Sequence, residues 1–406
     1  MTSPSPAPAG AAPSGRLAIV LSHPTQYYSP WFRWLREHTS LSLRVFYLWE
    51  FGVTAKRDPE FQQTFRWDVD LLAGYEYEFV PNIARDPGTH HFAGLRNPTL
   101  TSRLAAFRPD AILLFGYANA THLRLILWAR RRRIPLVFRG DSHFLGRARP
   151  PFLARNVLRF LYAQFAGFTY VGVANRAYFA TLGVPSAKLF FAPHSVDHTR
   201  FDPSLEPART AATALRSSLG LTPSTRVALF AGKLLPAKQP RELLDAFMSL
   251  PPSDTALVFV GTGPESAELV ARANTTRSHR VFFLPFANQS EMPARYLLAD
   301  VFALPSRGLY ETWGLAVNEA MHMGIPALVS DRVGCQPDLV TDGDTGWVFH
   351  ADDPTHLRDR LAAALAVDLV PFRPRVASRI AGYTYAQTTS GLLNALAHAA
   401  PLAFRR

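Results

Sequence analysis

Short apolar runs of strand length alternate with helix-length segments along most of this chain, and the alternation occurs in two separate series. The first series opens with a strand predicted at residues 16–23, after which Ser29 and Pro30 predict the N-cap and the first residue of a helix. The second series opens with a strand predicted at 226–232. Strand, helix and strand in succession imply a right-handed crossover and a parallel sheet. We therefore predict an α/β fold of two tandem Rossmann-like, doubly wound domains that face a central cleft.

The two series also set the expected domain boundaries. We expect a disordered, Pro-rich tail over 1–15, an N-terminal domain over 16–205 and a C-terminal domain over 206–380. The linker is expected at 198–220. The last segment, 381–406, is expected to form a helix that packs back on the N-terminal domain.

Composition excludes several classes of protein. Of the 406 residues, 48% are hydrophobic and 18% are charged, which excludes an intrinsically disordered chain for most of the length. A single cysteine, Cys335, excludes a disulfide framework and a multi-cysteine metal site, and the histidine spacing indicates no metal site. No run of 18 apolar residues lacks a charge, so no membrane-spanning helix is expected.

The formal net charge of +12 favours polyanionic partners such as phosphates, acidic lipid headgroups or nucleic acid. The densest basic run is at 128–133. It fits a solvated helix end, which the helix dipole stabilises, and it also fits peripheral docking on an anionic membrane. The aromatic residues of 29–35 either share that surface or pack in the core.

Two glutamates, Glu311 and Glu319, flank the predicted start of a helix near Gly314. The first turn of a helix leaves N–H groups free, here those of Gly314 and Leu315, and the helix dipole adds positive potential. Such a site suits a diphosphate. One carboxylate in the loop and one on the helix would then accept hydrogen bonds from hydroxyl groups on either side of it.

Two lysines, Lys233 and Lys238, follow the strand that ends at Gly232, and they are half of the four lysines in the chain. Cations at the carboxyl end of a strand are suited to holding phosphate oxygens. A second glycine-rich turn contains Gly261 and Gly263 directly after an apolar strand, which permits a close approach of the backbone to a ligand.

Taken together, these motifs resemble those of retaining nucleotide-sugar glycosyltransferases of the GT-B type, family 4, also called glycosyl transferases group 1. The match covers roughly residues 226–350. Its elements are Gly232-Lys233-Leu234 with Lys238, Val260-Gly261-Thr262-Gly263, and Glu311 to Glu319 followed by Ala320, Met321, Gly324 and Pro326.

The resemblance implies roles for residues of the C-terminal domain. Lys233 and Lys238 would neutralise the donor diphosphate, Glu311 would contact the donor sugar, and Glu319 would contact the ribose. The backbone of Gly314 and Leu315 would bind phosphate. The chain departs from the family pattern at Thr312-Trp313, where Gly-Phe is usual, so the sugar end of the pocket is expected to differ in shape.

The N-terminal domain resembles a subgroup whose first loop reads His-Pro-x-Gln-Tyr, here with His23, Gln26 and Tyr27. We expect these residues on the acceptor side of the cleft, together with Arg139 and Asp141 of the loop after the fourth strand. Family members often carry a histidine after the fourth strand that faces the donor sugar. The loop here contains Arg139, Asp141 and His143, so either His143 or Arg139 takes that place.

The resulting hypothesis is a cytoplasmic enzyme, with or without peripheral membrane association, that transfers a sugar from a nucleotide-diphosphate sugar to an unidentified hydroxyl acceptor, with retention of configuration. We predict His143, Glu311 and Lys238 as catalytic residues, and we expect neither metal nor nucleic acid to bind. A place in cell-envelope polysaccharide biosynthesis is expected. Two alternatives stay open, namely a nucleotide-sugar epimerase of the same fold and a non-catalytic basic binding protein. A glycosidase is disfavoured because its two carboxylates must face one bond, and the lysine pair has no role in that reaction.

Overall fold

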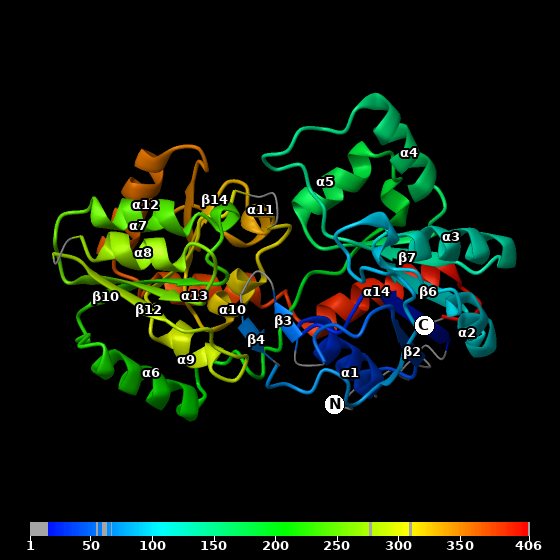
Figure 1. Cartoon of the computed structure of the whole chain (residues 1–406), viewed down its shortest axis with the longest axis horizontal. Coiled ribbons are helices and arrows are strands. Elements are labelled where there is room, and N and C mark those ends of the chain that lie inside the picture. The colour runs from blue at the N-terminus through cyan, green and yellow to red at the C-terminus, as the bar shows by residue number, and fades with distance from the viewer. Residues whose placement is uncertain are drawn as a thin grey trace, which may run out of the picture.

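The computed structural model describes residues 15–53, 56–58, 63–65, 67–275, 278–307 and 311–404 of the chain. All but the last residue of the predicted N-terminal tail lies outside the described residues. Figure 1 shows two α/β lobes side by side, each built on a twisted sheet covered by helices. This is the predicted fold class, and it is confirmed.

The N-terminal domain contains a parallel sheet of seven strands. In spatial order these are β5 (Glu76–Phe79), β2 (Ser42–Tyr47), β1 (Arg16–Leu21), β6 (Ala111–Phe115), β7 (Leu136–Arg139), β8 (Gly167–Tyr170) and β9 (Leu189–Phe191). Its helices are α1 (Tyr28–His38), α2 (Leu100–Phe107), α3 (Ala120–Arg132), α4 (Phe152–Tyr162) and α5 (Val173–Thr181). A short hairpin of β3 (Lys56–Asp58) and β4 (Gln63–Phe65) lies outside this sheet.

The C-terminal domain contains a parallel sheet of six strands. In spatial order these are β12 (Arg280–Leu284), β11 (Thr255–Val260), β10 (Arg226–Ala231), β13 (Val301–Leu304), β14 (Ala327–Ser330) and β15 (Gly346–Phe349). Its helices are α6 (Glu206–Ser218), α7 (Pro240–Met248), α8 (Ser266–Ala273), α9 (Met292–Leu297), α10 (Leu315–His322), α11 (Gln336–Leu339), α12 (Pro354–Ala366) and α13 (Phe372–Ile380).

Each sheet is buried on both faces, which explains why its strands are continuous apolar runs. In β1, Ala18 and Val20 pack into one core cluster, whereas Leu17 and Ile19 pack into another on the opposite face. Alternate side chains of a strand point to opposite faces, so a strand covered on both sides has no polar face.

The last long helix, α14 (Tyr385–Ala399), returns to the N-terminal domain. Its buried Leu392 and Leu396 belong to the same core cluster as Trp31 of α1. The indole N–H of Trp31 donates to Thr389 Oγ1 at 3.0 Å. In Figure 1 this helix, in red, lies among the blue N-terminal elements.

The structure corrects one expectation and specifies two details that the sequence had left open. Helix α1 begins at Tyr28 rather than after Ser29, and the Thr25 hydroxyl accepts a hydrogen bond from the Tyr28 backbone N–H. The expected linker is largely occupied by α6. Of the aromatic residues in 29–35, Trp31 and Phe32 are buried, so they belong to the core and not to a membrane-facing surface.

Candidate active site

A pocket of about 450 Å³ lies between the two domains, and its wall combines loops that follow β1, β7, β10, β11 and β13. Carboxyl ends of parallel strands are where open α/β sheets bind ligands. All but three of the predicted site residues line this pocket. The predicted residues that line it are His23, Gln26, Tyr27, Asp141, Lys233, Lys238, Gly261, Glu311, Thr312, Trp313, Gly314, Leu315 and Glu319.

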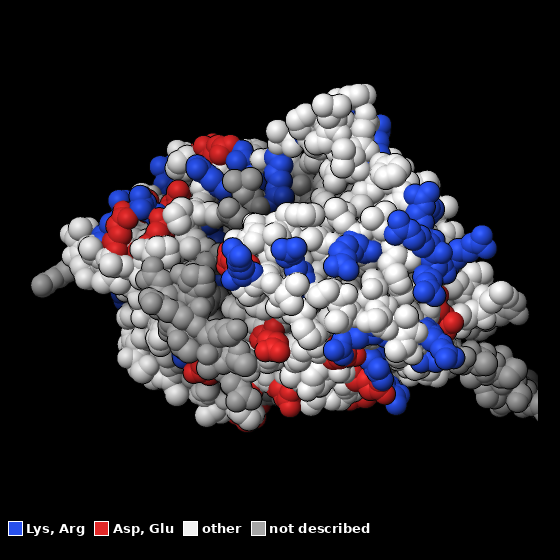
Figure 2. Space-filling model, turned by 45° about the vertical axis from the view of Figure 1, so that its right-hand side comes forward, with Lys and Arg blue, Asp and Glu red and all other residues white. Residues whose placement is uncertain are grey.

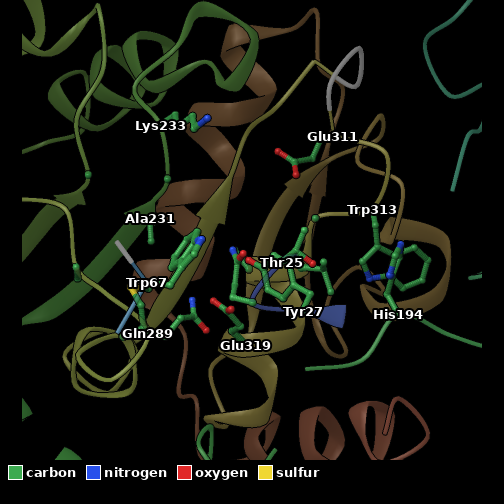
Figure 3. Close-up of a pocket in the computed structure, with 18 of the residues that line it drawn as sticks. Thr25, Tyr27, Trp67, His194, Ala231, Lys233, Gln289, Glu311, Trp313 and Glu319 are labelled. Atoms are coloured by element: carbon green, nitrogen blue, oxygen red, sulfur yellow. The ribbon is translucent and has the colours of Figure 1, made fainter. Parts of the chain in front are cut away.

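The two predicted glutamates lie at different ends of this pocket. Figure 3 shows Glu311 and Lys233 at one end and Glu319 at the other, with Tyr27 between them. The Lys238 ammonium lies 2.7 Å from Glu311 Oε2, and the Ser306 hydroxyl donates to the same oxygen at 3.0 Å. This end therefore combines two cations, Lys233 and Lys238, with one carboxylate that holds Lys238 in place.

Helix α10 presents its N-terminus to the pocket, because Gly314, Leu315 and Ala316 line the wall. Gly314 has φ of +98°, a left-handed conformation that favours glycine. The turn at Gly261, with φ of +129°, has a second constraint, since a Cβ there would collide with the carbonyl oxygen of Gly232. Backbone thus lies directly at the pocket wall on two sides, as a phosphate site requires.

Glu319 is buried, with 3% of its surface exposed. Its Oε2 accepts a hydrogen bond from the Tyr296 hydroxyl at 2.6 Å, whereas its Oε1 accepts no well-formed hydrogen bond within the described residues, although Tyr27 and Gln289 lie beside the carboxylate. Burial raises the pKa of Glu319 to about 7, although the hydrogen bond from Tyr296 opposes this. An unpartnered buried carboxylate oxygen at a pocket wall is costly unless a ligand hydroxyl binds it.

The first loop of the N-terminal domain reaches into the same space. Burial, and next the charge of Glu319, raise the pKa of Tyr27 well above its ordinary value, so its hydroxyl keeps its proton. His23 packs edge-on against Trp49 and Phe51, with ring centroids 5.7 and 5.3 Å apart. Burial lowers the pKa of His23 to about 4, so the ring is neutral at pH 7.

Asp141 joins the two domains at the pocket wall. Its Oδ2 accepts a hydrogen bond from Thr312 Oγ1 at 2.8 Å and lies 3.4 Å from His194 Nε2. Burial alone would raise the pKa of Asp141, but the His194 and Thr312 hydrogen bonds hold it at about 2. The threonine at the position where the family usually has glycine therefore anchors the C-terminal loop to the N-terminal domain.

His143 lies just behind the wall. Its Nδ1 accepts from the Leu145 backbone N–H at 3.1 Å, so its Nε2 carries the proton and donates to the Glu311 carbonyl oxygen at 3.3 Å. Burial lowers the pKa of His143, which keeps the ring neutral. The structure thus connects His143 to the backbone of Glu311, and a direct contact with substrate stays a prediction.

Arg139 and Gly263 are the other two predicted residues outside the lining. The buried Arg139 guanidinium donates to the carbonyl oxygens of Ala192 and Pro193 and lies over the ring of Trp31. It supports the chain that leads to His194 and does not face the pocket. Gly263 packs against the backbone of Leu234, where a side chain would not fit.

Several pocket residues were not predicted from the sequence, and four of them have side chains suited to contacting a ligand: Trp67, His194, Gln289 and Tyr296. Trp67 lies in the long segment after β2, where no motif marks it. His194 lies in the stretch 192–201, which resembles a motif of the family, at a position where the family usually has asparagine. That departure from the motif could have indicated His194 as a pocket residue. Gln289 and Tyr296 lie in and after the loop that follows β12, and they carry no local pattern.

Donor atoms suited to a metal come together away from this pocket. Within the described residues, Asp86, His90 and His91 have ligand atoms within 4.8 Å of one another on an exposed loop. None of the three lines the pocket. Within the part of the chain that the structure describes, no helix is long and apolar enough to cross a membrane.

Comparisons with known proteins show which family the chain resembles in sequence. The family model for "Glycosyl transferases group 1" matches residues 212–378. A GDP-mannose-dependent alpha-(1-6)-phosphatidylinositol monomannoside mannosyltransferase of Mycolicibacterium smegmatis is 32% identical over 304 residues, which cover 72% of this chain and 76% of that protein. A D-inositol 3-phosphate glycosyltransferase of Mycolicibacterium gilvum is also 32% identical, over 44% of this chain and 41% of that protein.

Solved structures show the same architecture. Anabaena HepE in complex with UDP superimposes with a TM-score of 0.69 and 16% identity, covering 94% of this chain and 99% of that one. The catalytic domain of starch synthase IV from Arabidopsis thaliana gives 0.69 at 14% identity, covering 96% and 100%. The architecture is the GT-B fold, and the chain belongs to the glycosyl transferases group 1 family and is a glycosyltransferase.

Proposed function

We propose that this enzyme transfers a sugar from a nucleotide-diphosphate sugar to a hydroxyl group of an acceptor, with retention at the anomeric carbon. One arrangement carries the proposal. Lys233 lies at one end of an interdomain pocket with Glu311, which pairs with Lys238, and Glu319 lies at the other end with an Oε1 that is open to a further hydrogen bond. The N-terminus of α10 lines the wall of the same pocket. A diphosphate next to a ribose fits the charges and the acceptor oxygen in that order.

The chemistry follows from where charge develops. Cleavage of the donor's sugar–phosphate bond leaves negative charge on the departing diphosphate. Cations and N–H groups that are already in position stabilise that charge without reorganisation. Lys233 and Lys238 would do this without a divalent metal. Glu311, held by Lys238 and Ser306, would accept hydrogen bonds from the sugar.

The relatives guide the choice of donor and acceptor. One is named for GDP-mannose and phosphatidylinositol mannoside and the other for inositol 3-phosphate, so a glycan, lipid-linked or small polyhydroxy acceptor is proposed here. GDP-mannose is the first donor to test. A cytoplasmic enzyme of cell-envelope polysaccharide synthesis, in peripheral contact with the membrane, fits these relatives. Retention is supported by the motif resemblance.

The test has two stages. Thermal unfolding is measured against a panel of nucleotide sugars, and the cognate donor is expected to raise the melting temperature most, because it binds the folded state. The chosen donor is then followed by proton NMR with and without inositol phosphate and mannoside acceptors. A new glycosidic bond with the donor's anomeric configuration supports the proposal. Epimerised donor in the absence of acceptor would indicate an isomerase instead, and inverted product would overturn retention.

A further inference from the structure

Helix α4 carries an apolar stripe on its solvent side. Phe152, Leu153, Val157 and Phe160 are each between 65% and 77% exposed. The last three occur at i, i+4 and i+7, so they share one face of the helix. The opposite side is already packed, since Leu158 and Leu161 contact the core of the N-terminal domain and Tyr162 belongs to it. The exposed stripe is therefore additional to what the fold needs.

The surroundings of α4 are strongly basic. Residues 111–196 contain twelve lysines and arginines but a single acidic residue, Asp141, which lies in the pocket wall. Arg149 and Arg159 are exposed beside the stripe, and Arg130 at the end of α3 donates to Gln164 just after α4 at 3.0 Å. In Figure 2 the upper lobe, where Figure 1 places α4, is largely white, with Lys and Arg gathered on the flank below it.

We propose that α4 and the basic end of α3 form a docking surface for an anionic lipid bilayer. A helix that lies in a membrane interface combines an exposed apolar face with flanking arginines, which attract acidic headgroups while the apolar side chains enter the acyl boundary. A second copy of this chain is a poor occupant, because it would bring the same positive charge to the contact.

The position of α4 in the chain connects the proposed docking surface to the active site. The loop that connects β7 to α4 carries Asp141 and His143, so the surface and the active-site wall are parts of one continuous segment. A bilayer against α4 would therefore bind the same segment that forms part of the wall of the interdomain pocket, where a lipid-linked acceptor is needed. The docking itself does not depend on which sugar is transferred.

The first experiment is co-sedimentation of the full chain with vesicles of phosphatidylcholine alone or with 30 mol% phosphatidylglycerol. Binding is expected for the anionic vesicles and is expected to weaken as salt rises. Val157→Asp and Phe160→Asp should each lower the partition coefficient at least about tenfold. Val370→Asp is the matched control, because Val370 in the C-terminal domain is 71% exposed against 67% for Val157. Equal loss in the control, or no loss in either α4 variant, would overturn the proposal.

A second readout does not rely on loss of binding. The single cysteine, Cys335, is fully buried, so Val157→Cys and Val370→Cys each accept one environment-sensitive fluorophore. A blue shift on anionic vesicles is expected at position 157 only. A shift at 157 without vesicles that grows with protein concentration would instead indicate self-association. Transfer to a soluble acceptor should be unchanged in all of these variants, which separates failure of docking from failure of the proposed reaction.

Discussion

The Lys238 ammonium and the Glu311 carboxylate form a close ion pair, 2.7 Å apart, although the two residues are far apart in the sequence. Lys238 ends a short 3-10 turn after β10, whereas Glu311 precedes α10, and the side chains of both are largely buried. The pair also contacts Ser306, which donates to the same oxygen of Glu311. A bound diphosphate would compete with Glu311 for this cation, which links donor binding to the position of the carboxylate.

Replacing Lys238 should therefore slow the chemical step more than it weakens binding. Lys238→Ala removes a cation where the leaving group gains charge, and kcat is expected to fall about a hundredfold or more. Lys188→Ala is the control, because Lys188 donates to the Phe165 carbonyl oxygen away from the pocket. Initial rates at saturating donor check this, and wild-type turnover in Lys238→Ala would remove the residue from the mechanism.

Glu319 should make donor binding depend on pH. Burial raises its pKa to about 7. Ribose hydroxyls donate hydrogen bonds and therefore favour the ionised carboxylate, so affinity for a nucleoside diphosphate is expected to rise as pH increases through about 7 and to level off above about pH 8. Isothermal titration calorimetry measures the affinity of wild type and of Glu319→Gln for the same ligand at each pH. The ligand's own titration contributes equally to both proteins, so it cancels in the comparison. The same pH slope in both proteins would contradict the assignment.

The same raised pKa has an opposite consequence for stability. A carboxyl whose pKa is higher in the folded than in the unfolded chain stabilises the fold most at low pH. This contribution is lost as pH rises through the folded pKa, here about 7. Urea unfolding without ligand should therefore show a free-energy difference between wild type and Glu319→Gln that falls from pH 5 to 7.5. A difference that stays constant over that range would show that Glu319 is ionised throughout, contrary to the raised pKa.

The sequence predicted the parallel strands well, because fully buried strands leave an unbroken apolar signal. The strand predicted at 16–23 is β1 over Arg16–Leu21, and that predicted at 226–232 is β10 over Arg226–Ala231. Strand β5 was not predicted, since Glu76–Phe79 lies at an edge of the sheet and is half polar and partly exposed. Edge strands lose the buried pattern on which such predictions depend.

Contacts between the domains were beyond sequence analysis for a different reason. Asp141 and Thr312 meet at 2.8 Å only because two separately folded sheets face each other. Nothing in the local pattern of either segment marks the other as its partner. The same holds for Trp67, which lines the pocket from a segment without a recognisable motif. Motifs therefore predicted many of the residues that each domain contributes to the pocket, and the structure was needed to show which of them meet across it.

Trp67 is expected to set affinity for the nucleotide. It lies 6.2 Å from Phe286, ring centroid to centroid, and Asp68 next to it accepts a hydrogen bond from the Ser290 backbone N–H at 3.0 Å. Aromatic side chains stack on bases with about 1–3 kcal/mol each. Trp67→Ala should raise the donor KM at least about tenfold with kcat little changed. Trp34→Ala, on α1 outside the pocket, is the control. An unaltered KM for Trp67→Ala would place the base elsewhere.

Asp338 connects the domains at the start of α5. Its carboxylate accepts the Val173 backbone N–H at 2.9 Å and the Tyr383 hydroxyl at 3.3 Å. A side chain at Gly172 would collide with Asp338 and Trp313, so the contact has no room for a larger residue. Burial raises the pKa of Asp338 to about 6, even though both hydrogen bonds favour the ionised form. This carboxylate is thus a titratable part of the domain contact.

Asp338→Asn should remove a pH-dependent component of stability. Because the folded pKa exceeds the unfolded one, Asp338 stabilises the fold most below pH 4 and loses this contribution as pH rises through about 6. The free energy of unfolding of wild type minus that of Asp338→Asn is therefore expected to fall by about 2–3 kcal/mol between pH 4 and 7. Urea unfolding checks this, with the exposed Asp359→Asn as control. An equal change in the control would show that the effect is not specific to Asp338. A difference that does not fall with pH would show that the interdomain carboxylate is ionised at both pH values.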